Sequence, residues 1–116
     1  MPSPRRIEKL EILLREEIAA GIDRAIEFSA GTLVTITRVA VSPDGRYATV
    51  YFSALGGSRA NALAVLQKNA YHLQQEINRA LRMRPVPKIR FAHDEGEEKR
   101  ERVEESLAAL KRKSDL

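Results

Sequence analysis

Hydrophobic residues recur along the first quarter of the chain with the spacing of a helix. From Arg5 to about Phe28, one residue in every three or four is a large aliphatic one, as on the buried face of an amphipathic helix. These residues are Ile7, Leu10, Leu14, Ile18, Ile22 and Ile26. Leu13 is expected to widen this stripe. Gly21 lowers helix propensity by about 1 kcal/mol relative to Ala, so fraying or a bend is expected there.

Two shorter helical patterns adjoin each other in the second half of the chain. Ser58 can cap a helix from Arg59 to about Asn69. Its expected inward residues are Ala62, Val65 and Leu66. Residues 70–81 form the second pattern, because their apolar side chains lie four positions apart, at Leu73, Ile77 and Leu81. Asn69–Ala70 is the expected bend between the two helices.

Two segments with strand patterns lie between the first helix and Ser58. Residues 32–41 are rich in β-branched side chains, and residues 47–53 alternate between two faces. One face carries Ala48, Val50 and Phe52, and the other carries Tyr47, Thr49 and Tyr51. The sequence Ser-Pro-Asp-Gly at 42–45 is a type I turn signal, so the two strands are predicted to form an antiparallel hairpin.

A third strand pattern follows the last helix. Prolines at 85 and 87 prevent further helix, and residues 88–93 alternate, with Ile89 and Phe91 inward and Lys88 and Arg90 outward. The element order is therefore α-β-β-α-α-β. Burying every apolar stripe requires the helices to pack on one face of a three-stranded sheet, which is an α+β fold.

The length of 116 residues indicates one domain, expected over residues 5–94. Residues 1–4 contain two prolines and are expected to form a flexible leader, and residues 95–116 form a charged tail, partly helical or disordered. The sequence shows no apolar run of membrane-spanning length and no signal peptide. We therefore expect a monomer in the cytoplasm, with no membrane association.

Positive charge is concentrated in one segment. Residues 59–91 hold seven Lys and Arg residues against a single acidic one, Glu76, whereas residues 1–58 are neutral and residues 92–116 carry a net charge of −2. Such clustering is typical of proteins that bind the phosphates of a nucleic acid, although a solubilising surface gives the same pattern. The candidate RNA-binding residues are Arg79, Arg82, Arg84, Lys88, Arg90, Lys68, Arg5 and Arg6. Arg84 is also placed to cap carbonyls of the preceding helix.

The outward residues of the sheet are a second candidate surface. Tyr47, Thr49 and Tyr51 are predicted to share the open face with Lys88 and Arg90, and aromatic and basic residues on an exposed sheet can stack RNA bases. Tyrosine is also a common residue at outward strand positions. That plainer interpretation is favoured by the sequence.

The sequence shows no pattern typical of an enzyme or a metalloprotein. It contains no cysteine and only two histidines, His72 and His93, which are far apart in the sequence and lack a set of carboxylates or thiolates at ligand spacing. We expect no catalytic residues, no metal and no cofactor.

Two segments of the sequence resemble the ribosome-binding factor A family of bacteria and organelles. They are residues 33–53, Leu-Val-Thr-Ile-Thr-Arg-Val-Ala-Val-Ser-Pro-Asp-Gly-Arg-Tyr-Ala-Thr-Val-Tyr-Phe-Ser, and residues 82–94, Arg-Met-Arg-Pro-Val-Pro-Lys-Ile-Arg-Phe-Ala-His-Asp. The resemblance covers about residues 5–94. It implies a KH-like fold of type II topology, in which an interhelical kink at an alanine replaces the usual Gly-x-x-Gly loop. Here that kink would be Asn69, Ala70 and Tyr71.

The resemblance also implies a function. Members are non-enzymatic assembly factors that bind the immature small (30S) ribosomal subunit, assist maturation of its rRNA, often matter in the cold, and are released by an assembly GTPase. Two positions depart from the family pattern: Tyr71 stands where many relatives have Gly, and Gln74 where many have Arg. The alternatives are a general nucleic-acid-binding KH-like module, a small enzyme and a protein–protein adaptor.

Overall fold

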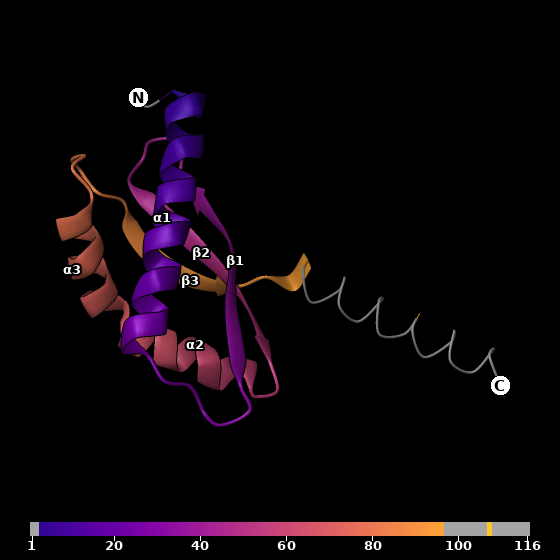
Figure 1. Cartoon of the computed structure of the whole chain (residues 1–116). Coiled ribbons are helices and arrows are strands. Elements are labelled where there is room, and N and C mark those ends of the chain that lie inside the picture. Colours follow the sequence, from indigo (N-terminus) through magenta and orange to yellow (C-terminus); the bar gives the residue numbers. More distant parts are fainter. Residues whose placement is uncertain (1–2, 97–106, 108–116) are drawn as a thin grey trace.

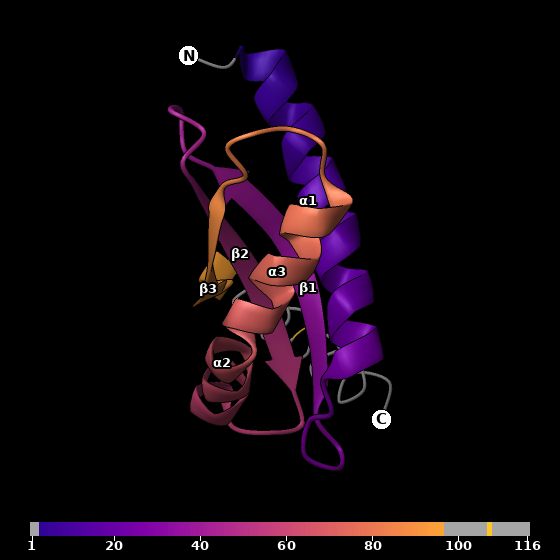
Figure 2. The same ribbon diagram turned by 90° about the vertical axis from the view of Figure 1, so that its left-hand side faces the viewer.

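The computed structural model describes residues 3–96 and Leu107. Its elements are α1 (Pro4–Ala25), β1 (Leu33–Val41), β2 (Tyr47–Leu55), α2 (Arg59–Lys68), α3 (Ala70–Ala80) and β3 (Lys88–His93). The predicted order and α+β class are confirmed, and Figures 1 and 2 show the helices gathered on one side of the sheet. The predicted boundaries at 1–4, 5–94 and 95–116 stay a prediction, because most of the proposed tail lies outside the described residues.

The strand order is β1-β2-β3, with β1 and β2 antiparallel and β2 and β3 parallel. The hairpin turn forms as predicted, with the Gly45 N–H donating to the Ser42 carbonyl at 2.8 Å. Gly45 has a φ of +75°, which glycine adopts without a steric penalty. A parallel pair cannot be joined by a tight turn, so α2 and α3 form the crossover that returns the chain to begin β3 beside the start of β2.

The core lies between the sheet and the helices. Ala48, Val50 and Phe52 of β2 are fully buried, as the alternation predicted. The α1 stripe is narrower than expected, because Leu13 is 48% exposed and does not widen it. In an α-helix neighbouring residues point about 100° apart, so with Leu14 buried against the sheet Leu13 turns toward solvent. The helix also ends at Ala25, before Phe28, because Ile26 is already extended.

Gly21 does not fray α1, which continues to Ala25. It lies where α1 meets α3: an added Cβ would be 2.9 Å from Glu76 Oε2 and 3.0 Å from Leu73 Cδ2. Glycine at this position therefore lets α1 and α3 approach closely, which compensates for its low helix propensity.

The bend between α2 and α3 is confirmed at Asn69, which ends one helix and begins the next. Its side-chain amide donates to the Val65 carbonyl at 2.8 Å, and its own carbonyl accepts from the Leu73 N–H at 3.0 Å. Ser58 caps α2 as predicted, since its Oγ accepts from the Asn61 N–H. Val65 is only half-buried, so Ala62 and Leu66 are the buried core residues of α2, and half-buried Leu63 packs against the core beside them. Among the described helices, none combines the length and apolar character needed to cross a bilayer.

Candidate nucleic-acid interface

Three segments that are distant in the sequence meet at one end of the molecule: the start of α1, the β1–β2 turn and the loop between α3 and β3 (Figures 1 and 2). A hollow of about 330 Å³ between them is lined by Arg6, Ile7, Leu10, Asp44, Gly45, Met83, Arg84 and Pro85. The Lys88 N–H donates to the Arg46 carbonyl at 2.8 Å, which fixes the first residue of β3 beside the turn. We call the cations of these segments the basic end: Arg5, Arg6, Arg46, Arg82, Arg84 and Lys88.

The basic end contains five of the eight predicted RNA-binding residues and one that the sequence did not single out. Arg46 belongs to the neutral half of the chain, so a charge count by segment could not identify it. Its position directly after the predicted turn was the only sequence signal for it. A large polyanion can reach the cations of this end, because their side chains are exposed.

Arg84 has a structural role as well. Its Nη1 donates to the carbonyls of Leu81 and Met83 at 2.8 and 2.7 Å, and its Nη2 donates to the Asn78 carbonyl at 2.9 Å. The guanidinium thus satisfies carbonyls at the end of α3, where a cation also complements the helix dipole. Three of its five N–H groups are used in this way.

The remaining predicted residues lie elsewhere. Arg79 is exposed on the last turn of α3, and its Nε donates to the Gln75 carbonyl at 3.4 Å. Lys68 is exposed at the last turn of α2, beside the kink. Arg90 lies on the open face of the sheet, where its Nε donates to Thr49 Oγ1 at 3.0 Å. The eight predicted residues therefore do not form one continuous patch.

Gln74 and Tyr71 are the two positions that the resemblance marked as departures, and both lie on α3 near the kink. Gln74 Oε1 accepts from the Ile89 N–H at 2.9 Å, and Gln74 Nε2 donates to the Pro87 carbonyl at 3.1 Å. This side chain therefore fastens α3 to the start of β3, a role in packing that replaces the basic contact expected of an arginine. Tyr71, beside half-buried Ala70, is 78% exposed.

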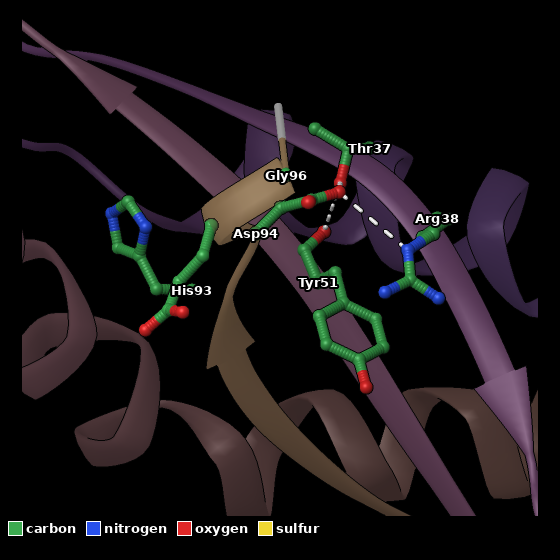
Figure 3. Close-up of a pocket in the computed structure, with 7 residues that line it drawn as sticks. Thr37, Arg38, Tyr51, His93, Asp94 and Gly96 are labelled. Carbon is green, nitrogen blue, oxygen red and sulfur yellow. Dashed lines mark hydrogen bonds and ion pairs between the residues drawn. The ribbon is translucent and has the colours of Figure 1, made fainter. Parts of the chain in front are cut away.

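The open face of the sheet carries a second group of polar residues (Figure 3). The Arg38 guanidinium lies over the Tyr51 ring, 3.8 Å from its centroid, and Arg38 Nε is 3.6 Å from Asp94 Oδ2. Thr37 Oγ1 donates to the same carboxylate oxygen at 2.6 Å. Arg38 was not among the predicted residues, because it faces outward only through a register shift between Ile36 and Arg38. The apolar pattern carries the signal of this bulge: Val34 and Ile36 are two positions apart, as are Val39 and Val41, but two adjacent polar residues separate the pairs.

Acidic groups do not form a metal site in the described part of the chain, where no three His, Cys, Asp or Glu side chains are grouped as ligands. Asp44 is a carboxylate that lines the hollow at the basic end. A hydrogen bond from Ser42 Oγ, at 2.6 Å, and one from the Arg46 N–H, at 3.0 Å, hold the pKa of Asp44 below its usual value. Asp44 is therefore ionised near neutral pH and orders the turn that presents Arg46.

Comparison with known proteins gives consistent matches. The family model described as Ribosome-binding factor A matches residues 6–107. A Ribosome-binding factor A of Anaeromyxobacter sp. (strain K) is 40% identical over 96 residues, which cover 80% of this chain and 70% of that protein. One of Phenylobacterium zucineum is 39% identical over 87 residues, which cover 74% of this chain and only 56% of that relative.

Solved structures of the same family are also similar to this chain. The crystal structure of ribosome-binding factor A from Thermus thermophilus has a TM-score of 0.67 and 28% identity, over 75% of this chain and 94% of that one. A homology model of the Thermus thermophilus factor, fitted into the cryo-EM map of a 30S–RbfA complex, has a TM-score of 0.63 and 31% identity, over 72% and 90%. With its KH-like α+β fold and a family match over most of its length, this chain belongs to the ribosome-binding factor A family.

Proposed function

We propose that this chain binds the small ribosomal subunit during its assembly and assists maturation of the subunit's rRNA by binding alone, without catalysis. The proposal extends to the setting that the family implies: a monomer in the cytoplasm, important in the cold, and released from the subunit by a GTPase. Binding can promote an RNA rearrangement only if the protein has different affinities for the two RNA states.

The observation that supports this proposal most directly is the convergence of Arg6, Arg46, Arg82 and Lys88 at one end of the molecule, contributed by three separate segments. Cations that converge on one end neutralise several neighbouring phosphates at once, and the released counterions favour binding. Such contacts position a protein without reading sequence, so specificity would come from the shape of folded rRNA. A related structure was fitted into a 30S–RbfA complex, which favours the same partner.

The experiment is co-sedimentation with ribosomal particles from a cell extract. We expect the protein to migrate with free small subunits and to leave mature ribosomes largely unbound. The variant Arg82→Gln with Lys88→Gln should bind small subunits at least about ten-fold more weakly near physiological salt, because each removes one phosphate contact. Arg84 is left unchanged, since its substitution would also disturb the fold.

A matched control removes the same charge elsewhere. Arg15→Gln with Arg24→Gln changes two exposed cations on α1, away from the basic end, and should leave binding within about two-fold. Equal weakening by both double variants would assign binding to net charge and contradict the site. Equal affinity for small subunits, duplex DNA and heparin would favour the alternative, a general nucleic-acid-binding KH-like module.

A further inference from the structure

The open face of the sheet carries two tyrosines, each with an arginine from a neighbouring strand beside its ring. Arg38 of β1 lies 3.8 Å from the centroid of Tyr51, and Arg90 of β3 lies 5.7 Å from that of Tyr47. None of the described helices covers this face (Figures 1 and 2). We propose that it is a second RNA contact, at which an unpaired nucleobase of a single-stranded segment stacks on the guanidinium plane of Arg38.

The Arg38 side chain is held in a geometry that suits stacking. Its guanidinium lies on the Tyr51 ring, and Asp94, which is only 8% exposed, holds its Nε from the side (Figure 3). Asp94 is in turn fixed by the hydrogen bond from Thr37. Because the side chain of Arg38 is still 57% exposed, the face of its guanidinium that points away from Tyr51 can receive a flat ligand. A base that stacks there would meet a surface that is already ordered, so little side-chain entropy is lost on binding.

The space around Arg38 and Tyr51 is adequate for a base. A shallow groove of about 690 Å³ is lined by Thr37, Arg38, Tyr51, His93, Asp94, Glu95 and Gly96. This volume lies within the range of roughly 300–1,000 Å³ that is usual for small-ligand sites. The groove is open on one side, as a base that remains attached to its strand requires.

The distribution of charge favours one orientation of the strand. Asp94 and Glu95 stand at the end of the groove, where they would repel a phosphate, while Arg90 and Lys88 lie toward the beginning of β3. The RNA backbone is therefore expected over β3 near the basic end, with the base directed toward Arg38. Tyr47 is opposite Lys88 in the sheet and 47% exposed, so a neighbouring base can stack there.

The occupant is single-stranded RNA and not a duplex. Bases within a duplex are already stacked on one another and present only their edges, whereas splayed bases stack on aromatic rings and on arginine planes. The choice of RNA over DNA rests on the proposed function.

The test uses the full chain and two unstructured RNA oligonucleotides of equal length, one of which lacks the bases of two consecutive nucleotides. Both have the same number of phosphates, so the ratio of their affinities isolates the contribution of the bases. For the unmodified protein we expect the complete oligonucleotide to bind about five-fold or more tightly, the lower limit for loss of one stacked base. Tyr51→Val and Arg38→Lys should each lower this ratio to what stacking on Tyr47 alone contributes.

Arg38→Lys contains its own control for charge, and Tyr51→Phe and Arg82→Gln are two further controls. Arg38→Lys preserves the charge and the ion pair with Asp94 but removes the planar guanidinium. A weaker preference of this variant for the complete oligonucleotide therefore cannot be electrostatic. Tyr51→Phe preserves the ring and should preserve the ratio. Arg82→Gln, at the basic end, should weaken both oligonucleotides alike. Urea unfolding of each variant shows whether the fold is intact, and Arg38→Lys decides the question if Tyr51→Val is unstable.

A ratio near one for the unmodified protein, or a ratio unchanged by Arg38→Lys, would overturn the stacking site. Neither result would affect co-sedimentation with small subunits, which tests the proposed function separately. A protein that failed to co-sediment but retained a ratio sensitive to Arg38→Lys would retain the stacking site and lose the proposed function.

Discussion

Arg82 and Arg84 lie in one loop, yet their replacement should have different effects on stability. Arg84→Met keeps the aliphatic stem and removes three hydrogen bonds, of 2.7 to 2.9 Å, to the carbonyls of Asn78, Leu81 and Met83. A net contribution of about 0.5–1.5 kcal/mol for each bond gives about 1.5–4.5 kcal/mol. Arg84 is exposed, so water can replace part of what is lost, and we expect a loss near the lower limit, about 1–2 kcal/mol.

The assay is urea unfolding followed by circular dichroism. For a domain of this size, with an m-value of roughly 1–3 kcal/mol per molar urea, the midpoint of Arg84→Met should fall by about half a molar or more. Arg82→Met should stay within about 0.5 kcal/mol of the unmodified protein, since Arg82 is exposed and has no hydrogen bond to another residue in the described structure. Equal midpoints for the two variants would refute the assignment of Arg84 to the end of α3.

This difference determines how RNA-binding data on the loop should be interpreted. If Arg84→Met both unfolds more easily and binds more weakly, the lost affinity reflects a displaced loop as well as a missing charge. Arg82 provides the clean measurement of a phosphate contact, because only its charge changes. Three of the five N–H groups of Arg84 are engaged with the protein, so the two that remain can add little bidentate binding of phosphate.

Three other predictions concern the fold. Gly21→Ala should be nearly neutral by thermal unfolding, since a gain of about 1 kcal/mol in helix propensity offsets the close contacts with Glu76 Oε2 and Leu73, whereas Gly21→Val should cost about 1–3 kcal/mol. Because the pKa of Asp44 is lowered on folding, its ionised carboxylate stabilises the folded protein above about pH 4, and this stabilisation is lost as the pH falls through the folded pKa. Asp44→Asn and the unmodified protein should therefore converge in melting temperature in acid. A chain truncated after Gly96 should keep a cooperative melt, and a lost transition would show that later residues complete the core.

The regular part of the fold was predictable from hydrophobic spacing. The alternation in β2 identified which residues are buried, and Asn69 was correctly identified as the bend, because both signals are local. Leu13 was assigned wrongly, since the width of a buried stripe depends on the surfaces that pack against it. The effect of Gly21 was misjudged for a similar reason. Its helix propensity is a property of the residue alone, whereas the advantage of having no side chain there depends on how closely α3 approaches α1.

The site was predictable only in part. A surplus of charge between residues 59 and 91 indicated the α3–β3 loop, and the position of Arg84 after the helix correctly predicted that it caps carbonyls of α3. Arg38 escaped notice because a bulge brings it onto the open face. Hydrogen bonds between distant segments are set by tertiary structure and have no periodic signal in the sequence, whereas the bulge interrupts the apolar alternation of β1 at Thr37 and Arg38.

The basic end exists because of the direction of β3. A strand parallel to β2 must begin where β2 begins, which is at the hairpin turn, so the loop that precedes β3 has to arrive beside that turn. The hydrogen bond from Lys88 to Arg46 marks the place where the two meet. An antiparallel β3 would have carried Arg82 to the opposite end of the sheet with the same net charge and the same composition. The position of the cations is thus a consequence of the α2–α3 crossover, and charge clustering along the sequence becomes clustering in space only because of this topology.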